Sequence, residues 1–401
     1  MRIFYASESA TNAEISGNRM WYYNLYLPLV DMGNDVVSFD YDIEPHYLNL
    51  DPSNPDQADF INRNRPKLEK ALLAQIEKAH AEKPVDLFFS YFFDACATPE
   101  TILKIRAMGI KTMNWYCNAS YQLHLVEKIS PAYDYCLCAE EFRMDDYRRI
   151  GANPIYCQMA VNTDIYKPYD LPVEYDVTFI GAKYGDRSEY VRYLYDEGIG
   201  VRVWGPWWRH DLEKKMKRKL GNQIRKGAKN LMTAEGWKKK GRKLASAFGK
   251  KEAAPAEQSG PRFERQKQYD IPPEIAGLPL SDQEMIEMYS RSRISLGFSQ
   301  AGELDLTEGK RILQVRLRDF EGPACGAFYV VEYMPELEHF YEIGKEIVCY
   351  ESKEDLAGKI KYYLEHEDER EAIRKAGYER AVKDHTWQKR FADVFRQAGI
   401  A

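Results

Sequence analysis

The stretch YDVTFIGAKYGDR, at residues 175–187, has the pattern of a strand that ends in a glycine-bearing loop before a helix. This order is typical of the first strand–helix unit of a doubly wound α/β domain. The backbone N–H groups of such a loop, together with the cation of Arg187, are suited to binding phosphate. The alternative is a tight turn with Arg187 on the surface.

The same alternation continues downstream and predicts a complete doubly wound domain. We expect its strands at 175–180, 201–204, 293–298, 327–331 and 346–350. Helical patterns lie between and after them, at 186–197, 281–291, 309–323, 352–366 and 368–383.

The first part of the chain has a similar alternation of β-rich runs and helical patterns, which predicts a parallel sheet with crossover helices. Its expected strands are 2–7, 35–41, 85–93, 111–117, 133–138 and 154–160, with helices that include 18–33 and 58–82. The turn-prone segment 164–174 shows no periodicity and is the expected linker.

The sequence therefore predicts an α/β protein of two Rossmann-like domains that face a central cleft. The domains are expected at 1–168 and 169–383, and a last helix, within 384–401, is expected to cross back onto the N-terminal domain. A length of 401 residues, 44% of them hydrophobic, is sufficient for two cores.

The composition excludes several classes of protein. No run approaches the roughly 20 apolar residues that span a bilayer, and Met1 leads directly into a strand-like run, so we expect a cytoplasmic protein. Seven cysteines without a paired CxxC argue against a disulfide framework and against a zinc site.

One segment, 209–251, carries sixteen Lys or Arg residues and three acidic ones within a chain of net charge −5. It belongs to an expected insertion at about 209–270. The functional interpretation is peripheral contact with an anionic membrane face or a phosphorylated lipid. The alternative is a solvated lysine-rich hairpin. Nucleic acid is not an expected partner, because no base-reading module accompanies the charges.

A second group of polar residues could meet a ligand in the C-terminal domain. The loop after the strand 293–298 begins at Ser299 and leads into the expected helix 309–323. The first residues of this helix include Lys310, and Arg311, Arg318 and Glu321 lie along one side of it. Arginines suit a diphosphate, and a carboxylate suits paired ribose hydroxyls. The alternative is an amphipathic helix with intrahelical ion pairs.

Several of these motifs occur together in a recognisable order. Upstream, 24–29 with 33–36 is similar to the N-terminal helix and strand of GT-B glycosyltransferases, and 160–168 resembles their interdomain hinge. The stretch from Tyr175 to Phe395 resembles the C-terminal domain of the spore-maturation CgeB and YkvP type glycosyltransferases. The resemblance rests on Phe179-Ile180-Gly181 with Arg187, Val203-Trp204-Gly205, Arg293-Ile294-Ser295-Leu296, Arg311 with Arg318-Asp319-Phe320-Glu321, Ala324-Cys325-Gly326, Glu346-Ile347 with Tyr350, and His385-Thr386-Trp387 with Arg390.

The resemblance implies the GT-B architecture and an enzyme that moves a sugar from a nucleotide diphosphate sugar to a hydroxyl of a cell-surface glycan, a lipid-linked saccharide or a protein. It implies no metal or other cofactor. Glu321 would hold the donor's ribose, and Arg187 and the region from Ser299 to Arg311 its diphosphate. The implied donor-binding set is Gly181, Arg187, Gly205, Ser299, Lys310, Arg311, Arg318 and Glu321.

Two departures from the family leave an alternative open. Leu313 stands where many retaining relatives have a second glutamate, and Asn118 stands where relatives often have an aspartate that could act as a base. The alternative is a catalytically impaired nucleotide- or carbohydrate-binding protein with the same fold.

Catalytic and acceptor-side residues are expected in loops after the strands of the N-terminal domain. His124 and Asp94 are the candidates for acid or base work. The candidates for contact with the acceptor are Ser16, Gly17, Asn18, Trp115 and Asn118.

Overall fold

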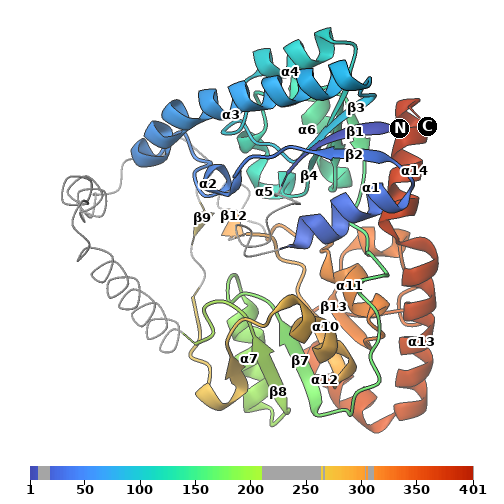
Figure 1. Cartoon of the computed structure of the whole chain (residues 1–401). Helices are drawn as coiled ribbons and strands as arrows, with labels where there is room; N and C mark the ends of the chain where they lie inside the picture. The colour runs from blue at the N-terminus through green and yellow to red at the C-terminus, as the bar shows by residue number, and fades with distance from the viewer. Residues whose placement is uncertain (8–18, 210–262, 265–266, 303, 306–310, 401) are drawn as a thin grey trace, which may run out of the picture.

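Two six-stranded parallel sheets form the frame of the molecule, one in each half of the chain (Figure 1). The computed structural model describes residues 1–7, 19–209, 263–264, 267–302, 304–305 and 311–400. Most of the basic segment 209–251 lies outside these residues. Both sheets have helices beside them, so the predicted fold class, two doubly wound α/β domains, is confirmed.

The N-terminal sheet has the strand order β2-β1-β3-β4-β5-β6, and every pair is parallel. All four residues of β3 are buried, as expected for a strand covered on both faces. The strands are β1 Arg2–Ala6, β2 Asp35–Ser38, β3 Leu87–Ser90, β4 Lys111–Tyr116, β5 Tyr135–Cys138 and β6 Pro154–Tyr156.

Helices connect these strands. The first is a continuous helical segment made of a π-helical turn, Tyr22–Tyr26, and α1, Leu27–Asp31. The longest is α3, Pro55–Glu82, which begins where the Asn54 side chain accepts the N–H groups of Asp56 and Gln57. The others are α2 Glu44–Tyr47, α4 Pro99–Ala107, α5 Ala119–Gln122 and α6 Met144–Arg149.

The C-terminal sheet has the order β10-β8-β7-β11-β13-β14 and is also parallel. Its strands are β7 Tyr175–Ile180, β8 Val201–Trp204, β10 Ala276–Gly277, β11 Ser292–Gly297, β13 Tyr329–Glu332 and β14 Val348–Tyr350. Its helices are α7 Arg187–Asp196, α10 Asp282–Ser290, α11 Arg318–Ala324, α12 Lys353–Glu365 and α13 Glu367–Asp384. A separate antiparallel pair joins β9 Phe263–Glu264 to β12 Leu304–Asp305.

The predicted helix 309–323 is wrong over its first half, because α11 begins only at Arg318. The backbone of the preceding segment, 311–317, pairs with the loop 299–301 instead. The N–H of Ala301 donates to Ile312 O, and the N–H of Gln314 donates to Ser299 O. A backbone group that bonds across to another segment cannot also close a helical turn. Strand β10, only two residues long, was also missed.

The last helix, α14 (Trp387–Ala398), crosses back onto the N-terminal domain as predicted (Figure 1). Trp387 is fully buried, its ring lies 5.6 Å from that of Trp115, and its indole N–H donates to Asn24 Oδ1 at 2.9 Å. Phe391 meets Phe89 of β3 edge-on at 5.7 Å. The C-terminal helix is therefore part of the N-terminal core.

Replacing Trp387 by alanine should lower the stability of the protein by about 3–5 kcal/mol, because the change leaves a cavity among buried rings and removes a buried hydrogen bond. Urea unfolding followed by far-ultraviolet circular dichroism would measure the shift of the midpoint. The control is Gln397→Ala, at an exposed position of the same helix, which should leave the midpoint unchanged. Equal midpoints for the two variants would contradict the docking of α14.

Candidate active site

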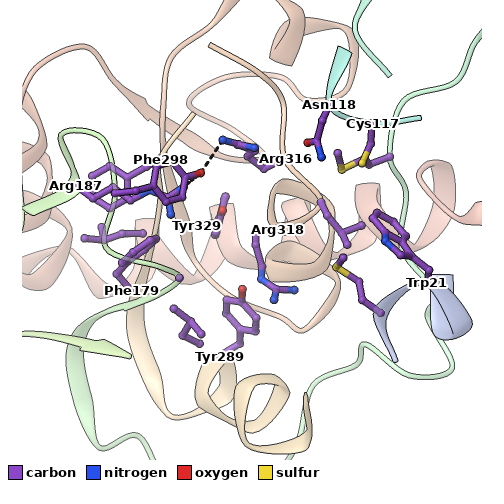
Figure 2. A pocket seen from close by; sticks show the side chains of 18 residues that line it. Trp21, Cys117, Asn118, Phe179, Arg187, Tyr289, Phe298, Arg316, Arg318 and Tyr329 are labelled. Carbon is purple, nitrogen blue, oxygen red and sulfur yellow. Dashed lines mark hydrogen bonds between the residues drawn. The ribbon is translucent and has the colours of Figure 1, made fainter. Parts of the chain in front are cut away.

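A cavity of about 280 Å³ lies between the two domains (Figure 2). Several of its lining residues lie in loops at the carboxyl ends of β4, β7 and β11, where open parallel sheets bind ligands. The N-terminal domain contributes Met20, Trp21, Cys117, Asn118 and Met159. The C-terminal domain contributes Phe179, Ile180, Gly181, Tyr184, Arg187, Tyr289, Leu296, Gly297, Phe298, Arg316, Leu317, Arg318 and Tyr329.

The glycine-bearing turn after β7 forms one wall. Gly181 lines the cavity, and its carbonyl accepts the indole N–H of Trp208 at 2.6 Å. Gly205 lies behind it, since a Cβ at Gly205 would stand 2.1 Å from Gly181 O, and its φ of +147° also favours glycine. Gly205, predicted to bind the donor, thus supports the turn and does not itself line the cavity.

Arg187, at the start of α7, places a buried guanidinium group at the cavity. It donates to Ala182 O at 3.0 Å and to Tyr184 Oη at 2.7 Å, and it lies over the Tyr184 ring at 3.8 Å. Burial lowers the pKa of Arg187, and the nearby Arg316 lowers it further. Among the described residues no carboxylate forms an ion pair with Arg187; its hydrogen-bond acceptors are neutral, and Asp186 and Asp319 act on its charge only from a longer distance.

Arg316, which the sequence analysis did not select, places a second cation beside Arg187 (Figure 2). It donates to the same hydroxyl, Tyr184 Oη, at 2.8 Å, and to Gln300 O. It too has no ion-paired carboxylate in the described part of the chain. Its backbone N–H donates to Asp319 Oδ2 at 2.7 Å, which fixes the start of α11.

Arg318 also lines the cavity, but it is paired with a carboxylate. It forms an ion pair with Glu321, whose side chain is 0% exposed and does not line the cavity. Glu321, predicted to hold the ribose, is occupied by Arg318 and by the Asn24 amide, which donates to Oε1 at 3.4 Å.

The remaining predicted donor residues form a polar cluster beside the cavity. Arg311 bridges Asp186 and Glu332, with 2.6 Å to each carboxylate. Burial raises the pKa of Asp186 to about 6. Ser299 Oγ donates to Glu332 O at 2.9 Å. Arg311 does not lie with Arg318 on one helix face, because α11 starts beyond it. Lys310 lies outside the described residues.

The two catalytic candidates do not reach the cavity. His124 is exposed, and Asp94 accepts the N–H groups of Lys128 and Ile129 at 3.2 and 3.0 Å. Burial raises the pKa of Asp94 to about 6. These bonds give Asp94 a structural role in ordering the 125–129 turn, so the geometry argues against both catalytic assignments.

Of the predicted acceptor-side residues, Asn118 lines the cavity. Trp115 is fully buried behind it and supports Trp21, whose ring lies 4.7 Å away and does line the cavity. Ser16, Gly17 and Asn18 lie outside the described residues.

The described lining of the cavity carries three arginines and no Asp, Glu or His. In the whole described part of the chain, no three His, Cys, Asp or Glu side chains are grouped as metal ligands would be. Nor does any helix within the described ranges have the length and apolar character needed to cross a bilayer. The seven cysteines are buried and unpaired.

With three arginines and several aromatic rings in its described lining, the cavity is a cationic pocket with aromatic walls.

A second cavity, of about 320 Å³, lies beside the interdomain linker on the other side of Tyr289. It has arginines too, but they are compensated. Arg293 pairs with Asp176, Arg370 with Glu367 and Arg374 with Glu371. An anion gains less from cations that are already paired, so the first cavity is the better candidate for an anionic ligand.

Behind the N-terminal wall lies a buried carboxylate that the sequence analysis missed, Glu140 at the end of β5. Its Oε1 accepts the N–H of Ser120 at 3.2 Å. Burial is the main cause that raises the pKa of Glu140 from 4.5 to about 7. The folded state therefore prefers the protonated form of Glu140. The free energy of unfolding is highest while this carboxyl is protonated in both states, and it falls as the pH rises from the unfolded pKa through the folded pKa.

We expect Glu140→Gln, which stays neutral, to gain stability relative to the wild type as the pH rises from about 5 to about 8, by on the order of 2 kcal/mol. Urea midpoints across this range would show the difference. Glu127→Gln, at an exposed position nearby, is the control and should follow the wild type at each pH. A constant difference between Glu140→Gln and the wild type would contradict the buried, protonated carboxylate.

Known proteins resemble this chain in part of its sequence and in its fold. A family model described as "Glycosyl transferase-like" matches residues 241–396. No curated protein sequence matches the chain.

Solved structures with a similar fold cover nearly the whole chain. A sucrose-phosphate synthase from Thermosynechococcus elongatus has a TM-score of 0.57 at 13% identity, over 99% of this chain and 98% of that one. HepE of Anabaena, in complex with UDP-glucose, has a TM-score of 0.53 at 10% identity, over 100% of both chains. A glycosyltransferase from Rickettsia africae ESF-5 has a TM-score of 0.52 at 12% identity, over 99% and 98%. The chain therefore has the GT-B fold of glycosyltransferases.

Proposed function

We propose that this protein is a glycosyltransferase that uses a nucleotide diphosphate sugar, and that the interdomain cavity binds the donor's diphosphate. The observation that carries the proposal is the pair Arg187 and Arg316, whose guanidinium groups meet at Tyr184 Oη without an ion-paired carboxylate among the described residues.

Two adjacent cations are unfavourable on their own, because they repel each other and because the buried Arg187 has lost most of its hydration. A diphosphate offsets both costs, since it brings two or more negative charges and several acceptor oxygens. Guanidinium groups match phosphate oxygens in pairs of hydrogen bonds. A third cation, Arg318, completes the basic side of the cavity.

Aromatic rings supply the rest of the binding surface. Tyr184, Tyr289, Phe298 and Tyr329 line the C-terminal side, and Trp21 lines the opposite wall. Such rings suit the apolar face of a sugar or base. The volume of about 280 Å³ is close to the lower limit of typical ligand pockets, which fits the diphosphate and sugar part of a donor.

In the proposed reaction, an acceptor hydroxyl oxygen forms a bond to the anomeric carbon of the donor sugar. The bond from that carbon to the diphosphate oxygen breaks, its electron pair leaves with the nucleoside diphosphate, and the hydroxyl proton is released. Arg187 and Arg316 stabilise the charge that develops on the leaving group. These cations take the role that a divalent metal has in other transferases, so we propose no metal cofactor.

The solved relatives support this class of donor, because HepE was crystallised with UDP and with UDP-glucose. The CgeB and YkvP type remains our proposal for the subfamily. A glycan, a lipid-linked saccharide or a protein remains the proposed acceptor, and the cytoplasm the proposed location. Contact of 209–251 with an anionic membrane stays a prediction.

A second candidate, a binding protein that has lost catalysis, is favoured by one observation. Asn118 is the polar side chain that the described N-terminal wall offers to an acceptor, and an amide does not accept a proton at neutral pH.

Arg187→Gln and Arg316→Gln should each weaken nucleoside diphosphate binding roughly tenfold to a hundredfold, because each removes charge-assisted hydrogen bonds. Isothermal titration calorimetry with UDP, GDP and dTDP would measure the dissociation constants. The matched control is Arg192→Gln, on the solvent side of α7, where the side chain pairs with Asp196. Unchanged affinity in both cavity variants would overturn the proposed site.

Wild-type protein incubated with UDP-, GDP- and dTDP-sugars should slowly release sugar from one donor class, since transferases commonly let water replace the acceptor. Arg316→Gln should slow this release, which chromatography of the nucleotide products would follow. Tight nucleotide binding with no release from any donor would favour the binding protein over the enzyme.

A further inference from the structure

A chain of buried polar contacts joins the crossing helix α14 to the cavity. The indole N–H of Trp387 donates to Asn24 Oδ1 at 2.9 Å. The other end of the same amide, Asn24 Nδ2, donates to Glu321 Oε1 at 3.4 Å. Glu321 is ion-paired with Arg318, which lines the cavity. The four residues come from α14, the first helical segment and α11, so the chain of contacts crosses the domain junction.

Glu321 needs these partners because its side chain is fully buried. A buried carboxylate without donors is strongly destabilised. Arg318 provides one donor and Asn24 another. The hydroxyl of Tyr166 in the linker also hydrogen-bonds to Glu321, and it accepts from Asn24 Nδ2 at 3.4 Å. Removal of one donor therefore changes how the remaining ones must arrange themselves around the carboxylate.

The orientation of the Asn24 amide is set by the chemistry of its neighbours. An indole N–H can only donate, so it requires the amide oxygen on its side. The NH₂ group is then directed to acceptors, which are the carbonyl of Met20 at 3.0 Å and, at 3.4 Å each, Glu321 Oε1 and Tyr166 Oη. Met20 itself lines the cavity. Leucine fills the same space as asparagine but offers neither the acceptor nor the donor.

We propose that Asn24 is a positioning residue for donor binding: through Glu321 it fixes where the Arg318 guanidinium stands in the cavity, and Trp387 fixes the amide. This rests on the proposed function. Asn24 does not line the cavity, so its effect on a bound diphosphate must pass through Arg318 or through Met20, and only Arg318 carries charge.

The test is a double-mutant cycle with inorganic pyrophosphate as the probe, measured by calorimetry on the full chain. Asn24→Leu should weaken binding about fivefold to tenfold, and Arg318→Gln by at least as much. In the Arg318→Gln background, Asn24→Leu should have no further effect. The control is Asn64→Leu, because Asn64 on α3 donates to a backbone carbonyl four residues earlier, as Asn24 does, but lies away from the cavity.

A second variant, Trp387→Phe, keeps a ring at the position and removes only the indole donor. It should also weaken pyrophosphate binding, and only when Arg318 is present. If Asn24→Leu and Trp387→Phe weakened pyrophosphate binding by the same factor with and without Arg318, this inference would be overturned, while the proposed diphosphate site would still stand. A wild-type protein that binds no pyrophosphate and no nucleotide would overturn the proposed function and this inference with it.

Discussion

The hydroxyl of Tyr184 is the point at which the cations of the cavity meet, because it accepts hydrogen bonds from both Arg187 and Arg316. Two guanidinium groups that share one neutral acceptor repel each other, and burial strengthens the repulsion. Each is held by a second bond to a backbone carbonyl, Ala182 for Arg187 and Gln300 for Arg316. The glycine turn after β7 and the extended segment 311–317 supply this geometry. The folded protein thus maintains a cation pair whose natural complement is an anion.

Periodicity was sufficient to predict the sheets, because strands buried on both faces appear as short apolar runs between turn residues. The same reasoning located α14. It failed at 311–317, where the apolar spacing suited a helix but the backbone bonds go to the loop 299–301. Periodicity reports which face is buried and not which partner the backbone finds. Pairing between segments that are distant in sequence, and a strand of only two residues such as β10, cannot be predicted from the residue pattern of a short sequence window.

Prediction of the site was partial for a related reason. Gly181, Arg187, Arg318 and Asn118 line the cavity, and each stands at the end of a strand or in a recognisable motif. Arg316 was missed because the expected helix 309–323 drew the selection to Arg311, Arg318 and Glu321 on one side, and that helix does not form at 316. His124 and Asp94 were chosen as ionisable groups after strands. The Asp94 carboxylate, however, accepts hydrogen bonds from backbone N–H groups of the turn at 125–129. Residue type alone does not distinguish a structural carboxylate from a reactive one.

The order of the chain explains why the crossing helix matters to the cavity. Trp387 stands near the end of the sequence, yet its indole orients an amide near the beginning, and that amide reaches Glu321 in the other domain. Without α14 in place, the buried amide oxygen of Asn24 loses the indole donor, and the NH₂ group is held only by its acceptors, among them Met20 O and Glu321. Arg318 therefore acquires its final surroundings only when both domains and α14 have packed together. Assembly of the domains and completion of the cationic cavity are in this sense the same event.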